Sequence, residues 1–259
     1  MHIYREPKVT LIARQEYLGA PHIRWTSDTG VPGQALAEFA GRLCYLSFGP
    51  EAGIEGGHKL IAGRTSNRDY LENILSVRHG SVLEHAVWSL LIEGVSRALT
   101  HELVRHRHFS YSQLSQRYVD ESDVGFVLPP EIREGSEAFE CWKASCQRAL
   151  DDYRDLLARI EDQVRDEPSP TLRRKRARQT ARSLLPNATE TKIVVTGNAR
   201  AWRHFIELRG SAAAEAEIRR LALAVLRILR EEAPTLFGDY RIETLRDGTE
   251  VVTTDFAGV

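Results

Sequence analysis

The stretch "RHRHFSYSQLSQRY" occupies residues 105–118 and gathers cationic and hydroxyl side chains in a chain of otherwise ordinary composition. It holds three arginines, two histidines, three serines and two tyrosines. A nucleic-acid patch, a metal site and a pocket for a phosphorylated small molecule are the three functions that such a cluster fits. The rest of the sequence distinguishes among them.

Length and composition indicate a soluble globular protein. The chain has 259 residues, of which 42% are hydrophobic and 27% charged. Its 35 basic and 36 acidic residues leave a net charge of −1, without the basic surplus that is usual in dedicated nucleic-acid binders. Cys44, Cys141 and Cys146 are too few for a disulfide framework. We see no signal peptide and no apolar run of about 20 residues that could span a membrane, so we expect a cytoplasmic protein.

Hydrophobic periodicity predicts an α+β fold in a single domain over residues 1–259, without repeats or linkers. Residues 48–67 are expected to form a loop, 78–81 a turn and 241–259 a tail. Strands are predicted over 9–14, 86–95 and 192–197, with a short extended piece at 124–130. Helices are predicted from Pro32, over 69–77, from Ser96 through Leu103, and over 171–185 and 199–208. A long helix from Ser136 to about Pro168 would have one apolar side, formed by Phe139, Trp142, Cys146, Ala149, Tyr153, Leu157 and Ile160. A further helix over 212–232 would have a core-facing stripe, formed by Ile218, Leu221, Ala222, Val225 and Ile228.

The histidines invite a zinc interpretation, because "HELVRH" (101–106) resembles the HExxH motif with one residue too many. A spacing of five residues separates His101 and His106 by about 140° around a helix, whereas a spacing of four gives about 40°. Two ligands cannot converge on one ion from that arrangement, and no cysteine pair has zinc spacing. We therefore expect no metal.

A nucleic-acid interpretation relies on "TLRRKRARQTARSLLP" (171–186) together with residues 105–118. No acidic residue lies between Pro168 and Thr189, but a basic helix face exposed to solvent explains this pattern as well. Arg178 and Arg182 are four residues apart and would share a face. No RRM, zinc finger or similar signature is present, so a module that binds RNA or single strands is kept as the second hypothesis.

Other catalytic motifs are missing from the sequence. There is no GxSxG nucleophile elbow, and neither GxGxxG nor GxxxxGK[ST] occurs. Arginine suits phosphate because its planar guanidinium donates two parallel charge-assisted hydrogen bonds. If the 105–118 segment were helical, Arg105 and Arg107 would point about 200° apart. The segment therefore either lines two sites with alternate residues or is irregular. The residues by themselves indicate a phosphorylated ligand and leave the reaction open.

The spacing within this stretch is similar to a known signature. Arg105-His106-Arg107, seven residues, Ser115, one residue and Arg117 match the RHR–x7–S–x–R pattern of the flavin-dependent thymidylate synthases. "RHGSVLEH" (78–85), "ARSLLP" (181–186) and "TGNARAWRHFIELR" (196–209) follow the order of that family. The resemblance covers roughly residues 35–240.

The resemblance implies a fold and a reaction. The fold would have a central, mostly antiparallel sheet flanked by long helices, as in the thymidylate synthase complementing family. The enzyme would methylate dUMP to dTMP, with methylenetetrahydrofolate as carbon donor and NADPH as reductant through bound FAD. It would act as a homotetramer with sites between subunits, on small molecules and not on nucleic acid or membranes. A member that binds these ligands without turnover is a third possibility.

The resemblance also assigns site residues by matched position. The residues expected at dUMP are Glu102, Arg105, Gln113, Ser115, Gln116, Arg117, Arg182 and Arg209. Arg209 would be catalytic, because a guanidinium stabilises negative charge that develops on the pyrimidine ring. The residues expected at FAD are Ser81, Glu84, Arg105, His106, Arg107, His108, Gln113, Asn198, Arg200 and His204.

Overall fold

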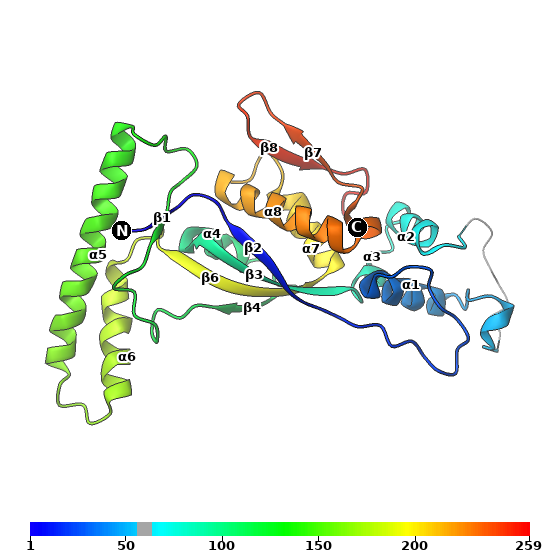
Figure 1. The fold of residues 1–259 in the computed structure, drawn as a ribbon, viewed down its shortest axis with the longest axis horizontal. Helices are drawn as coiled ribbons and strands as arrows, with labels where there is room; N and C mark the ends of the chain where they lie inside the picture. The colour runs from blue at the N-terminus through cyan, green and yellow to red at the C-terminus, as the bar shows by residue number, and fades with distance from the viewer. Residues whose placement is uncertain (56–63) are drawn as a thin grey trace. The chain divides into compact units, whose positions relative to one another are not determined.

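The computed structural model describes residues 1–55 and 64–259, and Figure 1 traces their elements. The loop expected over 48–67 therefore lies partly outside the described residues. Contacts between Cα atoms divide the chain into two compact units. The first unit comprises Met1–Lys8, Ile92–Arg105 and Tyr111–Val194, and the second comprises Val9–Leu91, His106–Ser110 and Val195–Val259. The single domain expected from the sequence stays a prediction, whereas the α+β class is confirmed.

A four-stranded sheet has the strand order β2-β3-β6-β4. Its strands are β2 (Lys8–Arg14), β3 (Val87–Ser96), β4 (Ser110–Gln113) and β6 (Glu190–Asn198), and each strand has residues in both units. β3, β6 and β2 confirm the three predicted strands. Strand β4 was not predicted, because its serines, tyrosine and glutamine carry no apolar alternation.

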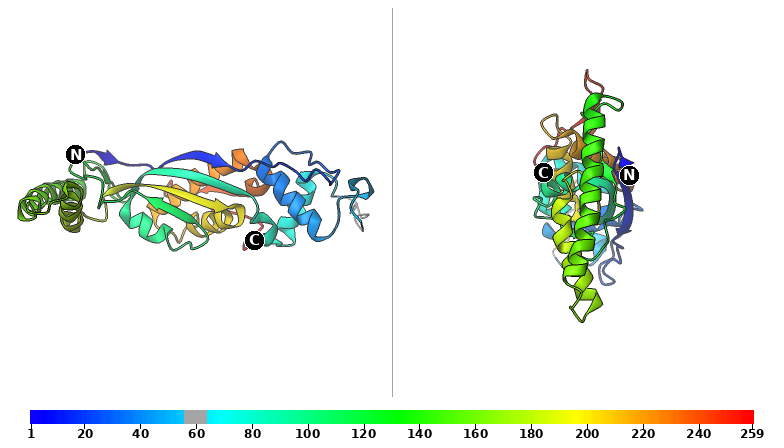
Figure 2. Two further views of the ribbon diagram at one scale, coloured as in Figure 1. Left: turned by 90° about the horizontal axis from the view of Figure 1, so that it is seen from below. Right: turned by 90° about the vertical axis from the view of Figure 1, so that its left-hand side faces the viewer.

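The first unit is built around a pair of helices, α5 (Glu137–Gln163) and α6 (Pro170–Ala181), which lie side by side in Figures 1 and 2. The Ser136 hydroxyl accepts a hydrogen bond from the Phe139 amide and so caps α5 as predicted. Tyr153 and Leu157 of α5 pack on two buried alanines of α6, and the short strands β1 (Ile3–Tyr4) and β5 (Phe126–Val127) pair in parallel. Helix α4 (Arg97–Leu103) completes this unit.

The predicted basic helix over 171–185 ends earlier than expected. The α-helical part stops at Ala181, and Arg182–Leu184 form a 3-10 turn, η2. Ala177 and Ala181 are buried against α5, so the helix is held by small residues on one face and not by a broad apolar stripe.

The second unit contains the remaining helices. These are α1 (Pro32–Cys44), η1 (Pro50–Ala52), α2 (Asn67–Ser76), α3 (Gly80–Leu83), α7 (Ala199–Arg209), α8 (Ala216–Glu232) and α9 (Pro234–Phe237). Ile218, Leu221, Ala222 and Val225 of α8 are buried and Ile228 is half-buried, so the predicted core stripe is confirmed. The helix begins at Ala216 and not at Ala212. The turn predicted at 78–81 is correct in place but contains the start of α3.

The expected tail 241–259 contains an antiparallel hairpin, β7 (Arg241–Thr244) and β8 (Glu250–Thr253). Gly248 adopts a φ of +83° in its turn, where the Leu245 amide donates to the Thr249 carbonyl at 2.7 Å. β8 packs against α7 and α8 in the same unit. The last part of the chain is therefore a structural element of the second unit.

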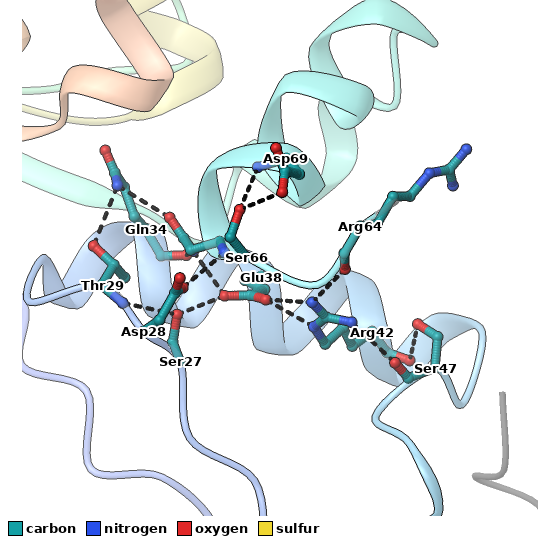
Figure 3. A network of polar contacts seen from close by, with 11 residues as sticks. Ser27, Asp28, Thr29, Gln34, Glu38, Arg42, Ser47, Arg64, Ser66 and Asp69 are labelled. Carbon is teal, nitrogen blue, oxygen red and sulfur yellow. Dashed lines mark hydrogen bonds and ion pairs between the residues drawn. The ribbon is translucent and has the colours of Figure 1, made fainter. Parts of the chain in front are cut away.

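A buried polar network joins α1 to the segments before and after it (Figure 3). Arg42 and Glu38 are 2% and 1% exposed and form an ion pair at 2.6 Å. Arg42 also donates to the carbonyls of Ser47 and Arg64, each at 3.0 Å, while the Asn67 amide donates to Glu38 at 2.8 Å. These bonds satisfy both charges in the unit's interior.

The cysteines differ in exposure. Cys44 at the end of α1 and Cys141 in α5 are exposed, whereas Cys146 is buried. Burial raises the pKa of the Cys146 thiol to about 11. In the part of the chain that the structure describes, no helix is both long and apolar enough to cross a membrane.

Candidate active site

The first unit holds seven of the residues predicted for dUMP, on α4, β4, the turn after β4 and η2. They are Glu102, Arg105, Gln113, Ser115, Gln116, Arg117 and Arg182. Helix α4 begins where the Ser96 hydroxyl accepts from the Leu99 amide at 3.0 Å. The Arg105 side chain just after it is exposed, and its Nε donates to the His101 carbonyl at 3.3 Å.

Gln113 connects α4 to β6. Its Nε2 donates to the hydroxyls of Thr100 at 3.2 Å and Thr191 at 3.3 Å, and both threonines are buried. Since both bonds use the amide nitrogen, Oε1 is the atom that Gln113 would offer a ligand.

Ser115 shapes the turn that carries the rest of the signature. Its carbonyl accepts from the amides of Tyr118 at 3.1 Å and Val119 at 3.0 Å, and its hydroxyl accepts from the Arg117 amide at 3.3 Å. Gln116 is only 5% exposed, and its Nε2 has no hydrogen-bond partner among residues 1–55 and 64–259. A buried polar atom without a partner is costly, so this amide indicates a place where a ligand would bind.

Arg97 at the start of α4 is a candidate that sequence reasoning missed. Its half-buried guanidinium has its pKa lowered by burial, an effect that Glu121 opposes and Arg182 reinforces. Burial also raises the pKa of the Glu121 carboxyl to about 7, although Arg97 acts to lower it. Because the charge of Arg182 reaches Arg97, the two arginines add to the positive potential of this region, which suits an anion. In the sequence, Arg97 is marked as a candidate only by its position directly after the Ser96 helix cap.

In the second unit, His106 and Arg209 are in direct contact. Arg209 Nε donates to His106 Nε2 at 3.1 Å, and the His106 ring packs on Phe205 with centroids 5.3 Å apart. Burial, together with the smaller effects of the Arg209 and His204 charges, lowers the pKa of His106 to about 4. His106 is therefore neutral near pH 7, with Nε2 as acceptor.

A pocket of about 340 Å³ lies in the second unit between α3 and α7. Five of the residues predicted for FAD line it, namely Glu84, His108, Asn198, Arg200 and His204. Arg200 Nη1 pairs with Glu84 Oε1 at 2.6 Å, and both side chains are about half exposed. The Asn198 side chain caps α7 by accepting from the Ala201 amide at 2.8 Å.

The remaining FAD predictions lie outside the lining of this pocket. His106 lies beside His204, with ring centroids 5.8 Å apart, and Arg107 is exposed next to it. Ser81 is exposed in the turn of α3. Arg105 and Gln113 belong to the first unit, whereas Arg209 belongs to the second.

Gly80 in that turn comes close to two other segments of the unit. A Cβ at this position would lie 2.8 Å from Arg200 Nε and 3.0 Å from the Val259 carbonyl carbon. A side chain at this position would therefore displace either the Arg200 side chain or the Val259 backbone, both of which belong to residues that line the pocket.

In the described residues, no group of three or more His, Cys, Asp or Glu side chains is arranged to hold a metal ion.

Comparison with known proteins gives the family of this chain. The family model "Thymidylate synthase complementing protein" matches residues 29–235. Enzymes named flavin-dependent thymidylate synthase from Mycobacterium avium (strain 104) and Mycobacterium tuberculosis (strain ATCC 25618 / H37Rv) are each 50% identical over 250 residues, which is 96% of both chains. This chain belongs to the thymidylate synthase complementing protein family, as the signature predicted.

A solved structure has the same fold. The UMP/dUMP methylase PolB from Streptomyces cacaoi, bound with 5-Br dUMP, matches with a TM-score of 0.63 at 21% identity. The match covers 92% of this chain and 96% of that chain. The family-type fold expected from the signature is thereby confirmed.

Proposed function

We propose that this protein is a flavin-dependent thymidylate synthase that converts dUMP to dTMP, with methylenetetrahydrofolate as carbon donor and NADPH as reductant. The observation that carries the proposal is the pocket of the second unit, because five side chains predicted for FAD line one cavity. The 50% identity to enzymes of that name over nearly the whole chain supports the same reaction.

The first unit fits a nucleotide monophosphate. Arg105, Arg117 and Arg182 are exposed and cationic, and the unpartnered amide of Gln116 gives a buried donor for a polar ligand atom. The same part of the first unit also offers carbonyl and carboxylate oxygens from Gln113 and Glu102 and a hydroxyl from Ser115. Arg97 beside Arg182 would strengthen the attraction for phosphate.

The second unit fits a flavin dinucleotide. Arg200, His204 and His108 provide donors for phosphate or ring oxygens, and Ser81 in the α3 turn is exposed. A pocket of about 340 Å³ is at the small end of ligand sites and would take part of FAD. When bound, the flavin supplies the reducing equivalents that come from NADPH. His106 and Arg107 of the same unit would complete its surroundings, and Arg105 and Gln113 stay predicted FAD contacts.

Arg209 would be the catalytic side chain. Its guanidinium is held by neutral His106, so its charge is not neutralised by this partner. A positioned cation stabilises negative charge on a pyrimidine carbonyl in the transition state, and such preorganised donors contribute most when they need no rearrangement.

We further propose a cytoplasmic homotetramer of single-domain subunits with sites shared between subunits.

The nucleic-acid alternative is less favoured, since Arg176 pairs with Glu167 at 3.0 Å and Arg178 with Asp120 at 3.4 Å. Those pairs reduce the positive field that a polyanion would meet.

The test is reconstitution. Purified protein is mixed with FAD, and dTMP formation is followed with dUMP, NADPH and methylenetetrahydrofolate, each omitted in turn. We expect a flavin absorption spectrum and product only in the complete mixture. A protein that takes up no flavin but binds an oligonucleotide with steep salt dependence would instead support the nucleic-acid module. Flavin binding without product would identify a member that has lost turnover.

A further inference from the structure

Residues 254–259 form a strap that crosses the second unit from the β7–β8 hairpin to the pocket. Gly258 and Val259 line the pocket, and Val259 is 6% exposed beside the Gly80 turn. No sequence motif marks these residues.

The strap is anchored at its beginning by a buried ion pair. Arg203 is 1% exposed and donates to both carboxylate oxygens of Asp239, at 2.7 and 2.8 Å. The Thr254 hydroxyl bonds to the same carboxylate, and it also accepts from the Phe256 amide at 3.0 Å. A bidentate, buried arginine–carboxylate pair is a rigid support, so the strap starts from a fixed point.

At its other end, the strap is held by Glu207. The Gly258 amide donates to Glu207 Oε2 at 3.0 Å. Arg200, His204 and Glu207 all line the pocket, and their spacings of four and three residues place them on one face of α7. Glu207 therefore connects the helix face that carries two predicted FAD residues to the strap.

From these contacts we infer that residues 254–259, positioned by Glu207, form a wall of the flavin pocket and set the rate at which FAD leaves. The inference rests on the proposed function, because it assumes that FAD is the ligand of this pocket. Gly258 and Val259 line the pocket, which makes the strap part of the binding site, and the anchors at Asp239 and Glu207 hold it there. Glu207 is accordingly a positioning residue that acts through the strap.

The experiment uses the protein reconstituted with FAD and measures FAD release from the rise in flavin fluorescence after dilution. Glu207→Ala removes the acceptor for Gly258 and should release FAD up to about tenfold faster, as expected for the loss of one hydrogen bond in a bound state. Glu207→Gln retains a carbonyl oxygen as acceptor and should release FAD nearly as slowly as the original protein. Arg227→Ala is the matched control, because it removes an exposed ion pair with Glu250 in the same unit and touches no residue of the strap or of the pocket.

The thermal midpoint of each flavin-free variant separates positioning from general stability. A Glu207→Ala protein with a lowered midpoint and an unchanged release rate would overturn the inference. If that variant does not fold, a chain that ends at Asp255 leaves α7 intact and must release FAD faster; an unchanged rate there overturns the inference as well. Failure of the original protein to bind FAD at all would instead remove the proposed function on which the inference rests.

Discussion

Arg209 donates its Nε hydrogen to Nε2 of His106 at 3.1 Å, which joins the residue predicted for catalysis to one predicted for FAD. The bond needs an unprotonated Nε2, and burial together with the charges of Arg209 and His204 keeps the pKa of His106 at about 4. A cation thus lies against a neutral ring that has no charge to pair with it. The pH dependence of the free energy of unfolding reports on His106, and the turnover of Arg209 variants reports on the cation.

The first prediction concerns pH and stability. An unfolded histidine has a pKa of about 6.5. Between about pH 6.5 and pH 4, therefore, His106 is protonated in the unfolded chain but stays neutral in the folded protein. The free energy of unfolding should therefore decrease as the pH is lowered from about 6.5 to about 4, by about 3 kcal/mol at most from this group. Urea unfolding at several pH values, compared with His106→Gln, measures it. Gln retains an acceptor for Arg209, so an equal decline in that variant would assign the effect to other groups.

The second prediction concerns Arg209. Replacement by Lys keeps the charge but loses the planar fork and the Nε donor to His106. We expect turnover to fall by about 10²–10³, the usual effect of removing one preorganised donor, with an unchanged circular dichroism spectrum. Arg227→Lys, at the exposed pair with Glu250, is the control. Near-normal turnover of Arg209→Lys would exclude the activating role.

The third prediction concerns Ser115. Its hydroxyl accepts from the Arg117 amide and has no base assigned to it, so we expect a binding role and not a nucleophilic one. Ser115→Ala should weaken dUMP binding up to about tenfold, as for a neutral hydrogen bond, while kcat changes less. Calorimetric titration with dUMP and steady-state kinetics provide the two numbers, with exposed Ser112→Ala as the control. A covalent adduct trapped on Ser115 would contradict this role.

The fourth prediction concerns the network around Arg42. Arg42→Ala leaves Glu38 buried without its cation, so the free energy of unfolding should fall by about 3–5 kcal/mol. The exposed pair of Arg68 and Glu72 in α2 is the comparison, because Arg68→Ala should cost less than about 1 kcal/mol. Denaturant unfolding of both variants checks the difference. Similar losses would mean that burial of the ion pair contributes little.

The sequence was most informative where one local pattern decides an element. The Ser136 cap and the apolar positions of α5 predicted its start and its buried side, and the core stripe of α8 was also correct. Spacing within residues 105–117 was sufficient to identify the family, since five fixed positions at set intervals rarely occur by chance. The assignment of individual residues to dUMP or FAD stays a prediction.

Elements that depend on distant contacts were not predictable in the same way. The Glu38–Arg42 network needs carbonyls and amides that are brought in by Arg64 and Asn67, more than twenty residues away. The β7–β8 hairpin was taken for a tail although "RDGT" (246–249) contains the Asp-Gly pair that is typical of tight turns. The positioning role of Glu207 depends on the contact between α7 and residues 254–259, which no local sequence pattern predicts.

The distribution of thiols has a practical consequence. Cys44 is exposed in the second unit and Cys141 in the first, while the buried Cys146 keeps its proton at neutral pH. A maleimide reagent would therefore attach one reporter to each unit of the unaltered chain. Paired spin labels or fluorophores at these two positions would measure the distance between the units before and after each ligand is added.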